Sequence, residues 1–163
     1  MLIHQLRSSE VEAFAELLMG IELGRNYYPT YEFLMKELDR GMKEDCLYIA
    51  YPDESEKEAV AVLWFKRQGA FHSFPYLHVI AVSEVAQGCG YGKQVMDFFE
   101  DEILNDGNKR MLQTKVFLLV NAENKKAINM YESRGYEFVT ELESLYRKRM
   151  TENLMMKKIC RQV

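Results

Sequence analysis

A glycine-rich loop, Gln87-Gly88-Cys89-Gly90-Tyr91-Gly92, is the segment of this chain whose residue types and spacing most clearly imply chemistry. An apolar run, Leu77 to Val82, precedes it, and apolar residues at helical spacing follow it. The first N–H groups of a helix lack internal partners and carry partial positive charge, and glycines let an anion approach the backbone closely. This strand–loop–helix pattern therefore predicts a phosphate-binding site, to which Lys93 could add a full positive charge.

Spacing separates the kinds of phosphate loop that this segment could be. A nucleoside-triphosphate loop needs glycine where this chain has Gln87, and serine or threonine where it has Gln94. A dinucleotide fingerprint beginning at Gly88 needs glycine at position 93, which is lysine, and the strand that ends at Asn121 offers no acid at its tip. The first interpretation fails, and a dinucleotide-dependent oxidoreductase remains only a weak alternative.

The loop fits a third pattern at every position, because it resembles the Gln/Arg-x-x-Gly-x-Gly/Ala loop of the GNAT superfamily of N-acetyltransferases. A second segment, Asn124-x-x-Ala127-x-x-x-Tyr131-x-x-x-Gly135-Tyr136, is similar to that superfamily's other coenzyme A segment in spacing and order. Together the two segments cover roughly residues 76–140.

The resemblance implies a mixed α/β (α+β) fold: a single-domain acyl-CoA N-acyltransferase with a twisted mixed sheet of about six to seven strands, splayed at the cofactor cleft and flanked by about four helices. It also implies acetyl-CoA as the acyl-donor substrate. The backbone of Ile80, Ala81 and Val82 would pair with the pantetheine arm like an added strand. The amides from Gln87 through Gly88, Cys89, Gly90, Tyr91 and Gly92 to Lys93 would hold the pyrophosphate.

Tyr131 and Asn124 take roles from the same resemblance. Tyr131 matches the tyrosine that faces the thioester sulfur and can protonate the leaving thiolate, a role that suits a phenol donor. The alternative is that Tyr131 only packs on its helix. Asn124 resembles the asparagine that hydrogen-bonds near the pantetheine arm, and it could also be a helix cap. Asn121, at a strand end, is more typical of a turn.

The amine acceptor must lose a proton before it attacks, so a base or a relaying water is required. Tyr76 and His78 lie on one face of the strand before the loop, at spacings similar to those of the histidine pair in the arylalkylamine branch. His78, whose side-chain type titrates near neutral pH, is the candidate base, although a lone strand histidine is often structural. Leu119 replaces the glutamate of bacterial relatives that acetylate ribosomal protein termini, and Glu84 is expected in a solvated turn.

Cysteine chemistry and metal chemistry are not indicated. Cys89 at a helix start raises the question of an acyl-cysteine intermediate, but direct transfer needs no enzyme nucleophile. The three cysteines are dispersed and form no Cys-x-x-Cys pair, and the three histidines have no metal-ligand spacing. We therefore predict no metal, no disulfide framework and a cytoplasmic location.

The elements that must position these residues follow from apolar periodicity and turn signals. We expect a first helix that is capped by Ser8 or Ser9. A break at Asn26 to Thr30 separates it from a second helix. We also expect a central strand, Tyr76 to Val82, that is buried on both faces. Gly135 is expected to end a helix in the left-handed conformation. The remaining expected elements are a strand at 3–6, a hairpin of 46–51 and 59–66, a helix ending near 105–107, a strand at 116–120, a helix at 124–134, strands near 136–140 and 154–159, and an exposed connection at 141–152.

Composition limits the function classes. The 163 residues suit one domain, 1–163, with a real core, and no apolar run is long enough to cross a bilayer. The net charge of −4 and the lack of clustered Lys/Arg argue against nucleic acid as a partner. Aromatic residues Tyr27, Tyr28, Tyr31 and Phe33, with acids Glu32 and Glu37, fall where relatives build part of the acceptor pocket, and would favour a positively charged amine.

We therefore predict an acetyl-CoA-dependent N-acetyltransferase that transfers an acetyl group to a primary amine by direct attack in a ternary complex. A non-catalytic acyl-CoA-binding or regulatory module on the same fold is the alternative. No membrane partner is expected, and a homodimer is common in the family. The identity of the acceptor, a small amine or a protein or peptide amine, does not follow from the sequence, and neither do the general base, the oligomeric state or the use of other acyl donors.

Overall fold

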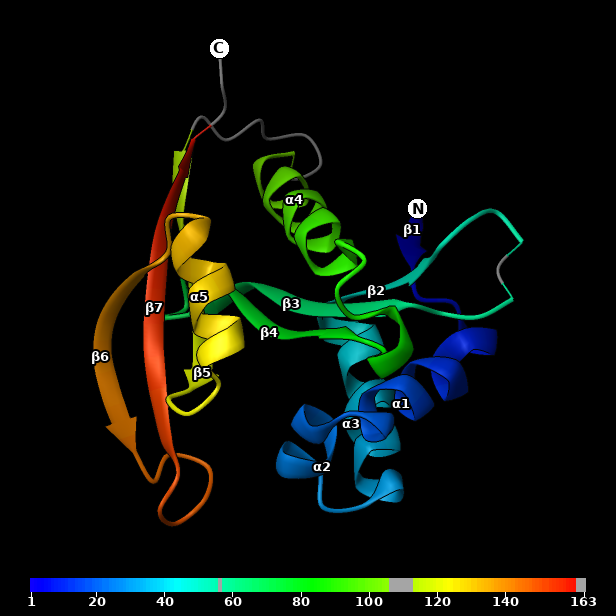
Figure 1. Cartoon of the computed structure of the whole chain (residues 1–163), viewed down its shortest axis with the longest axis horizontal. Helices are drawn as coiled ribbons and strands as arrows, with labels where there is room; N and C mark the ends of the chain where they lie inside the picture. The colour runs from blue at the N-terminus through cyan, green and yellow to red at the C-terminus, as the bar shows by residue number, and fades with distance from the viewer. Residues whose placement is uncertain (56, 106–112, 161–163) are drawn as a thin grey trace. The chain divides into compact units, whose positions relative to one another are not determined.

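The computed structural model describes residues 1–55, 57–105 and 113–160 (Figure 1). The strands are β1 Leu2–Gln5, β2 Cys46–Tyr51, β3 Ala61–Ala70, β4 Phe74–Val82, β5 Gln113–Asn121, β6 Glu137–Glu143 and β7 Thr151–Cys160. The helices are α1 Val11–Gly20, α2 Glu22–Tyr27, α3 Tyr31–Glu44, α4 Tyr91–Leu104 and α5 Lys125–Ser133, with short 3-10 turns at Ser8–Glu10 (η1) and Glu84–Ala86 (η2).

The seven strands form a mixed sheet in the order β1-β2-β3-β4-β5-β7-β6. β4 and β5 run parallel, whereas β1 with β2, β2 with β3, β5 with β7 and β6 with β7 run antiparallel. This architecture confirms the predicted mixed α/β fold and its strand number. The chain divides into two compact units, residues 1–66 with 79–101, and residues 67–78 with the described part of 102–163.

The first unit has its core where α1 and α3 meet β2 and β3. Phe14, Leu34, Leu38 and Trp64 have no exposed surface, and the Trp64 indole N–H donates to Asp45 at 2.8 Å. Each large apolar side chain buried in this way stabilises the fold by about 1.5–3 kcal/mol. The two predicted helices are present as α1 and α3. The short helix α2 between them was not predicted.

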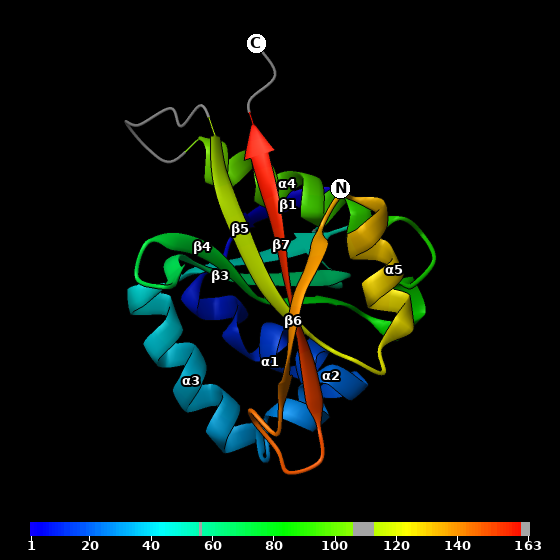
Figure 2. The same ribbon diagram turned by 90° about the vertical axis from the view of Figure 1, so that its left-hand side faces the viewer.

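The second unit is built on the long antiparallel ladder between β5 and β7, and Figure 2 shows β7 lying between β5 and β6. Val116, Leu118 and Val120 of β5 are buried on one face of this ladder. The predicted exposed connection from 141 to 152 is shorter in the structure, because β6 continues to Glu143 and β7 begins at Thr151. Glu152, expected on the surface, is 1 % exposed.

The prediction that the central strand β4 is buried on both faces is wrong. Its residues alternate between buried and half-buried along the whole strand, so one face is fully buried and the other is not. Apolar residues at both odd and even positions of the strand had suggested that both faces are buried. The half-buried face is the one that carries Tyr76, His78, Ile80 and Val82.

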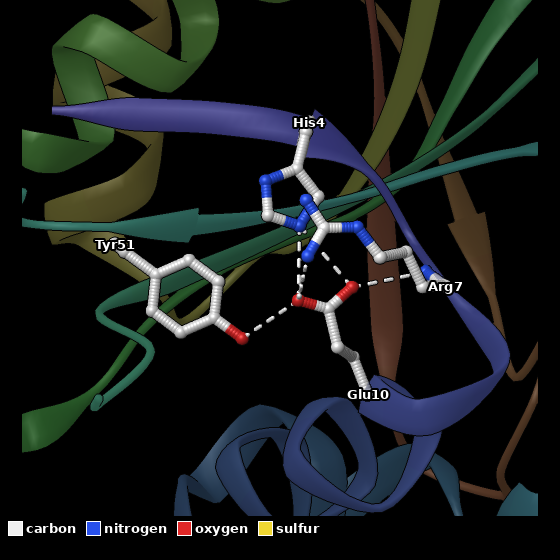
Figure 3. Close-up of polar contacts among 4 residues, drawn as sticks. All are labelled: His4, Arg7, Glu10 and Tyr51. Atoms are coloured by element: carbon white, nitrogen blue, oxygen red, sulfur yellow. Dashed lines mark hydrogen bonds and ion pairs between the residues drawn. The ribbon is translucent and has the colours of Figure 1, made fainter. Parts of the chain in front are cut away.

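A buried polar cluster joins β1, η1 and β2 in the first unit (Figure 3). The Glu10 carboxylate, 8 % exposed, lies 2.9 Å from His4 Nε2 and accepts hydrogen bonds from the Tyr51 hydroxyl at 3.0 Å and the Arg7 backbone N–H at 3.0 Å. The Arg7 guanidinium lies 3.8 Å away. The predicted serine cap is wrong, because Ser8 and Ser9 lie within η1 and Glu10 stands at the N-cap position of α1 without a side-chain cap hydrogen bond.

Substituting Glu10 by glutamine should lower the free energy of unfolding by about 1–3 kcal/mol at neutral pH, because buried donors lose a charged acceptor. Burial raises the pKa of Glu10, but the hydrogen bonds from Arg7, His4 and Tyr51 lower it by more, so the folded-state pKa lies below its ordinary value. The Glu10 contribution is therefore present above the unfolded-state pKa and is lost as the pH falls through the folded-state pKa.

Urea unfolding at neutral and acidic pH measures this difference, with Glu12→Gln, an exposed acid of α1, as the control. The gap between Glu10→Gln and the unmodified chain should narrow in acid. A gap that is the same at both pH values would contradict the assignment.

Candidate functional site

The glycine loop lies between η2 and α4 in the first unit, at the predicted strand–loop–helix position. Gly88 and Gly90 have φ of 83° and 84°, in the left-handed region that disfavours other residues. A Cβ added at either position would meet no heavy atom within 4 Å. Glycine is therefore required here by backbone conformation and not by lack of space.

The first backbone amides of α4 lie before the turn in which the helix supplies its own acceptors. The Gln94 N–H bonds to the Gly90 carbonyl at 3.2 Å, which makes Gly90 the residue before the first turn. The N–H groups of Tyr91, Gly92 and Lys93 belong to the first turn, in which the helix offers them no carbonyl acceptor. Buried Val95, Met96 and Phe99 anchor the helix, while residues 87–90 and Lys93 are exposed. The geometry suits an anion bound at a helix N-terminus.

The residues before the loop are firmly held. Ala81 is buried, Ile80 and Val82 are half-buried, and the Ser83 N–H bonds to the Val60 carbonyl at 2.9 Å. Glu84, a minor candidate base, is exposed on η2 with Arg25 3.9 Å away, as expected for a solvated turn.

His78 and Tyr76 lie on β4 in the second unit. Both are half-buried on the same face of the strand, with ring centroids 6.1 Å apart. Tyr76 pairs in register with Phe117 of β5, and Leu119, also half-buried, follows two residues later on that strand. The face that carries the candidate base therefore includes an apolar residue where some relatives have an acid.

Asn124 caps α5, as the sequence predicts. Its Oδ1 accepts a hydrogen bond from the Ala127 N–H at 3.1 Å. Asn121 Oδ1 accepts from the Glu123 N–H at 2.8 Å, which is the expected turn-forming role. The cap uses the carbonyl end of the Asn124 amide, and its NH₂ group is the donor that could serve a ligand.

Tyr131 lies near the end of α5 and is 6 % exposed. Burial raises the pKa of its phenol above the ordinary value, because the phenolate would lose hydration. The side chain is thus a neutral hydroxyl at physiological pH and can act as a hydrogen-bond donor. Its ring contacts that of Tyr136 at 5.7 Å between centroids.

The aromatic residues proposed for the acceptor pocket differ in how exposed they are. Tyr28 is buried and packs against Phe33 at 6.4 Å, whereas Tyr31 and Phe33 are 42 % and 44 % exposed at the first turn of α3. The acids near them form ion pairs within α3, Glu32 with Lys36 and Glu37 with Arg40. Such exposed pairs are weak, so a cationic ligand could compete with them.

Three observations on the described residues concern metal ligands, cysteines and membrane spans. Among them, no group of three or more His, Cys, Asp or Glu side chains is placed to hold a metal ion. Cys89 is exposed in the loop and forms no disulfide. No helix in the described segments is long and apolar enough to cross a membrane.

Two features near Tyr131 were not predicted from the sequence. Tyr136 was part of the matched segment, but its ring contact with Tyr131 was not foreseen; the signal is an aromatic residue five positions later, directly after a helix-ending glycine. Lys157, from β7, lies over the Tyr136 ring with Nζ 5.6 Å from its centroid. Nothing in the local sequence of β7 indicates this contact.

The mixed sheet and the left-handed glycine loop that opens a helix define an α/β protein, and comparison with known proteins narrows the class. The family model described as Acetyltransferase (GNAT) family matches residues 11–136. The chain belongs to this family of acetyltransferases.

Solved structures support the fold over the whole chain. The ribosomal-protein-S18-alanine N-acetyltransferase from Escherichia coli superposes with a TM-score of 0.75 at 17% identity, covering 99% of this chain and 96% of that one. An aminoglycoside 6'-N-acetyltransferase complexed with coenzyme A gives a TM-score of 0.75 at 16% identity, covering 100% and 99%. At these identities the likeness concerns the fold.

A relative with higher sequence identity is longer than this chain. The mycothiol acetyltransferase of Jonesia denitrificans is 30% identical over 105 residues, which is 61% of this chain and 32% of the relative. The match spans about a third of that protein's length.

Proposed function

We propose that this chain is an acetyl-CoA-dependent N-acetyltransferase that transfers the acetyl group to a primary amine by direct attack in a ternary complex. The observation that carries the proposal is the exposed loop with left-handed Gly88 and Gly90 at the start of α4, in a chain of the GNAT family. Backbone amides at such a helix start are suited to the pyrophosphate of coenzyme A.

Several backbone and side-chain groups would hold the donor. In this proposal the amides from Gln87 to Lys93 bind the pyrophosphate, and the backbone of Ile80 to Val82 pairs with the pantetheine arm. The Asn124 NH₂ group donates a hydrogen bond near that arm. Acetyl-CoA is a substrate here, and the proposed reaction requires no metal.

The chemistry is an acyl transfer whose proton movements fall to Tyr131 and a base. The amine lone pair attacks the thioester carbonyl, and the tetrahedral intermediate collapses with cleavage of the C–S bond. The Tyr131 phenol, which burial keeps protonated, donates a hydrogen bond to the departing thiolate and passes its proton to it. The proton lost by the amine passes to His78 directly or through a water.

Substituting His78 by glutamine is expected to lower kcat about tenfold, which is less than the roughly hundredfold or more that is typical for loss of a general base, because water can replace part of its role. The KM for acetyl-CoA should stay unchanged, since His78 is assigned to the acceptor side. Steady-state rates of thiol release measure both constants. An unchanged kcat would assign proton removal to water alone.

Substituting Gly90 by alanine is expected to weaken coenzyme A binding about fivefold to thirtyfold, because a left-handed backbone costs an L-residue about 1–2 kcal/mol. No neighbouring atom blocks the new methyl group, so the loss should arise from a changed loop conformation. Calorimetry with coenzyme A measures it, and Gly20→Ala on α1 is the control. Equal affinities in the two variants would contradict the proposed pyrophosphate site.

The proposed function is tested by free-thiol release from acetyl-CoA with a panel of amines: an alanine-terminated peptide, an aminoglycoside and a linear polyamine. The exposed rings of Tyr31 and Phe33 beside acidic residues favour a positively charged acceptor. We expect amine-dependent thiol release. Tight acetyl-CoA binding without turnover on any amine would favour a non-catalytic binding module, and preferential binding of NAD(P)H would overturn the proposal.

The cytoplasmic location, the single domain and the homodimer stay predictions. The location follows from the dispersed cysteines, and the homodimer from the family resemblance. Sedimentation of the purified chain would decide its oligomeric state.

A further inference from the structure

The end of α5 has a helix-terminating geometry that links Tyr131 directly to Tyr136. The Tyr136 N–H bonds to the Tyr131 carbonyl at 3.0 Å, and the Gly135 N–H bonds to the Glu132 carbonyl at 2.9 Å. Gly135 has φ of 84°. These are the two hydrogen bonds and the left-handed glycine of a Schellman motif, in which the residue after the glycine contacts the residue that accepts its N–H.

The side chains of the same two residues make that contact. The rings of Tyr131 and Tyr136 meet edge to face, with centroids 5.7 Å apart and an interplanar angle of 61°. Tyr136 is 2 % exposed, so its ring is more deeply buried than that of Tyr131. A ring buried on this scale has little room to turn, and it provides a fixed surface for its neighbour.

Lys157 supports Tyr136 from β7. Its Nζ lies over the Tyr136 ring, 5.6 Å from the centroid, and its alkyl chain approaches Gly135 closely enough that a Cβ there would lie 3.9 Å from Lys157 Cε. β7 is the strand with the longest ladder in this unit, and its pairing with β5 places Lys157 opposite Val116. The Tyr136 ring is therefore held both by the helix terminus and by the sheet.

We propose that Tyr136 is a positioning residue that fixes the orientation of the Tyr131 phenol through ring contact at the Schellman terminus of α5. This inference rests on the proposed function, in which Tyr131 protonates the thiolate. Tyr136 takes no part in bond making or proton transfer. Its contribution is that the phenol of Tyr131 needs no reorientation when the C–S bond breaks.

Steady-state kinetics of four variants distinguish a positioning role of Tyr136 from a general contribution to stability. The variants are Tyr136→Leu, Tyr136→Phe, Tyr131→Phe and the double variant Tyr131→Phe/Tyr136→Leu. An aromatic pair of this kind corresponds to about a threefold to tenfold change, so Tyr136→Leu should lower kcat by that factor. The affinity for coenzyme A should stay unchanged, and Tyr136→Phe, which keeps the ring, should restore kcat. In the Tyr131→Phe background, Tyr136→Leu should have no further effect, since the phenol it positions is gone.

Phe138→Leu is the matched control for loss of a ring in this segment, because Phe138 lies two residues later and is 54 % exposed. It should leave kcat unchanged. An equal loss of kcat from Tyr136→Leu with and without the Tyr131 hydroxyl would overturn the proposal, because it would show general structural support.

A measurement that needs no turnover keeps this inference separate from the proposed function. Ring-labelled tyrosine gives NMR signals for the ten tyrosines, and the Tyr131 signal is the one missing in Tyr131→Phe. We expect that signal to move in Tyr136→Leu and its phenol to titrate at lower pH, as the ring gains access to water. It should be unaltered in Tyr136→Phe and Phe138→Leu. An unchanged Tyr131 signal and titration in Tyr136→Leu would overturn the positioning role even in a chain that acetylates no amine tested.

Discussion

Phenylalanine at position 131 is expected to lower kcat about one hundredfold, the low end of the range for loss of a general acid. The substitution removes one hydroxyl and keeps the ring, so the contact with Tyr136 and the burial of α5 are preserved. Without that donor, the departing thiolate must leave unprotonated or wait for water, which the buried position hinders. The affinity for acetyl-CoA should change little, because the phenol is assigned to the leaving group in the transition state.

Thiol release under saturating substrates measures kcat, and calorimetry with coenzyme A measures affinity. Tyr146→Phe is the matched control, since Tyr146 is 52 % exposed in the connection between β6 and β7. Equal kcat values for Tyr131→Phe and the unmodified chain would remove Tyr131 from the mechanism. A parallel loss of affinity and rate would instead assign its hydroxyl to binding of the donor.

Alanine at position 24 is expected to destabilise the chain by more than about 3 kcal/mol, because backbone atoms and not a flexible side chain would have to move. Gly24 is buried in α2, and a Cβ built there would overlap the carbonyl oxygen of Leu18 in α1. Arg25 ties the same two helices together, since its guanidinium donates to the Gly20 carbonyl at 2.6 Å. The backbones of α1 and α2 therefore lie too close together at Gly24 to accommodate a methyl group.

Thermal unfolding should show this loss as a fall in Tm of about 10 °C for a chain of this length. Gly20→Ala is the control, because it makes the same substitution at the end of α1, where a Cβ meets nothing within 4 Å. Its effect should stay within about 0.5 kcal/mol. Similar melting temperatures for the two variants would show that α1 and α2 separate easily.

The success of the sequence predictions follows from how local the signals are. Gly135 adopts the left-handed conformation that was predicted for it at a helix end. Asn124 caps α5 with its own side chain. These features depend on residues within one turn of each other, so neighbouring sequence is enough to predict them.

The errors arose where distant residues decide the conformation. α2 is a helix of six residues that contains Gly24 and Asn26, both weak helix formers, and it depends on its packing against α1. Glu10, and not a serine, stands at the N-cap position of α1, and His4 and Tyr51 hold its carboxylate. The charged segment before Glu152 resembled a loop, but pairing of β6 with β7 extends the strands through it.

The sequence by itself determined the glycine loop between strand and helix, the start of α4, both ends of α5 and the family resemblance, because each of these depends on residue types at short, fixed spacings. Only the tertiary structure decided that Tyr131 is buried, that its ring meets that of Tyr136 and that Lys157 lies over the Tyr136 ring. Burial and ring contacts depend on which strand lies beside a helix. That choice is made by the whole fold through packing of residues far apart in the chain.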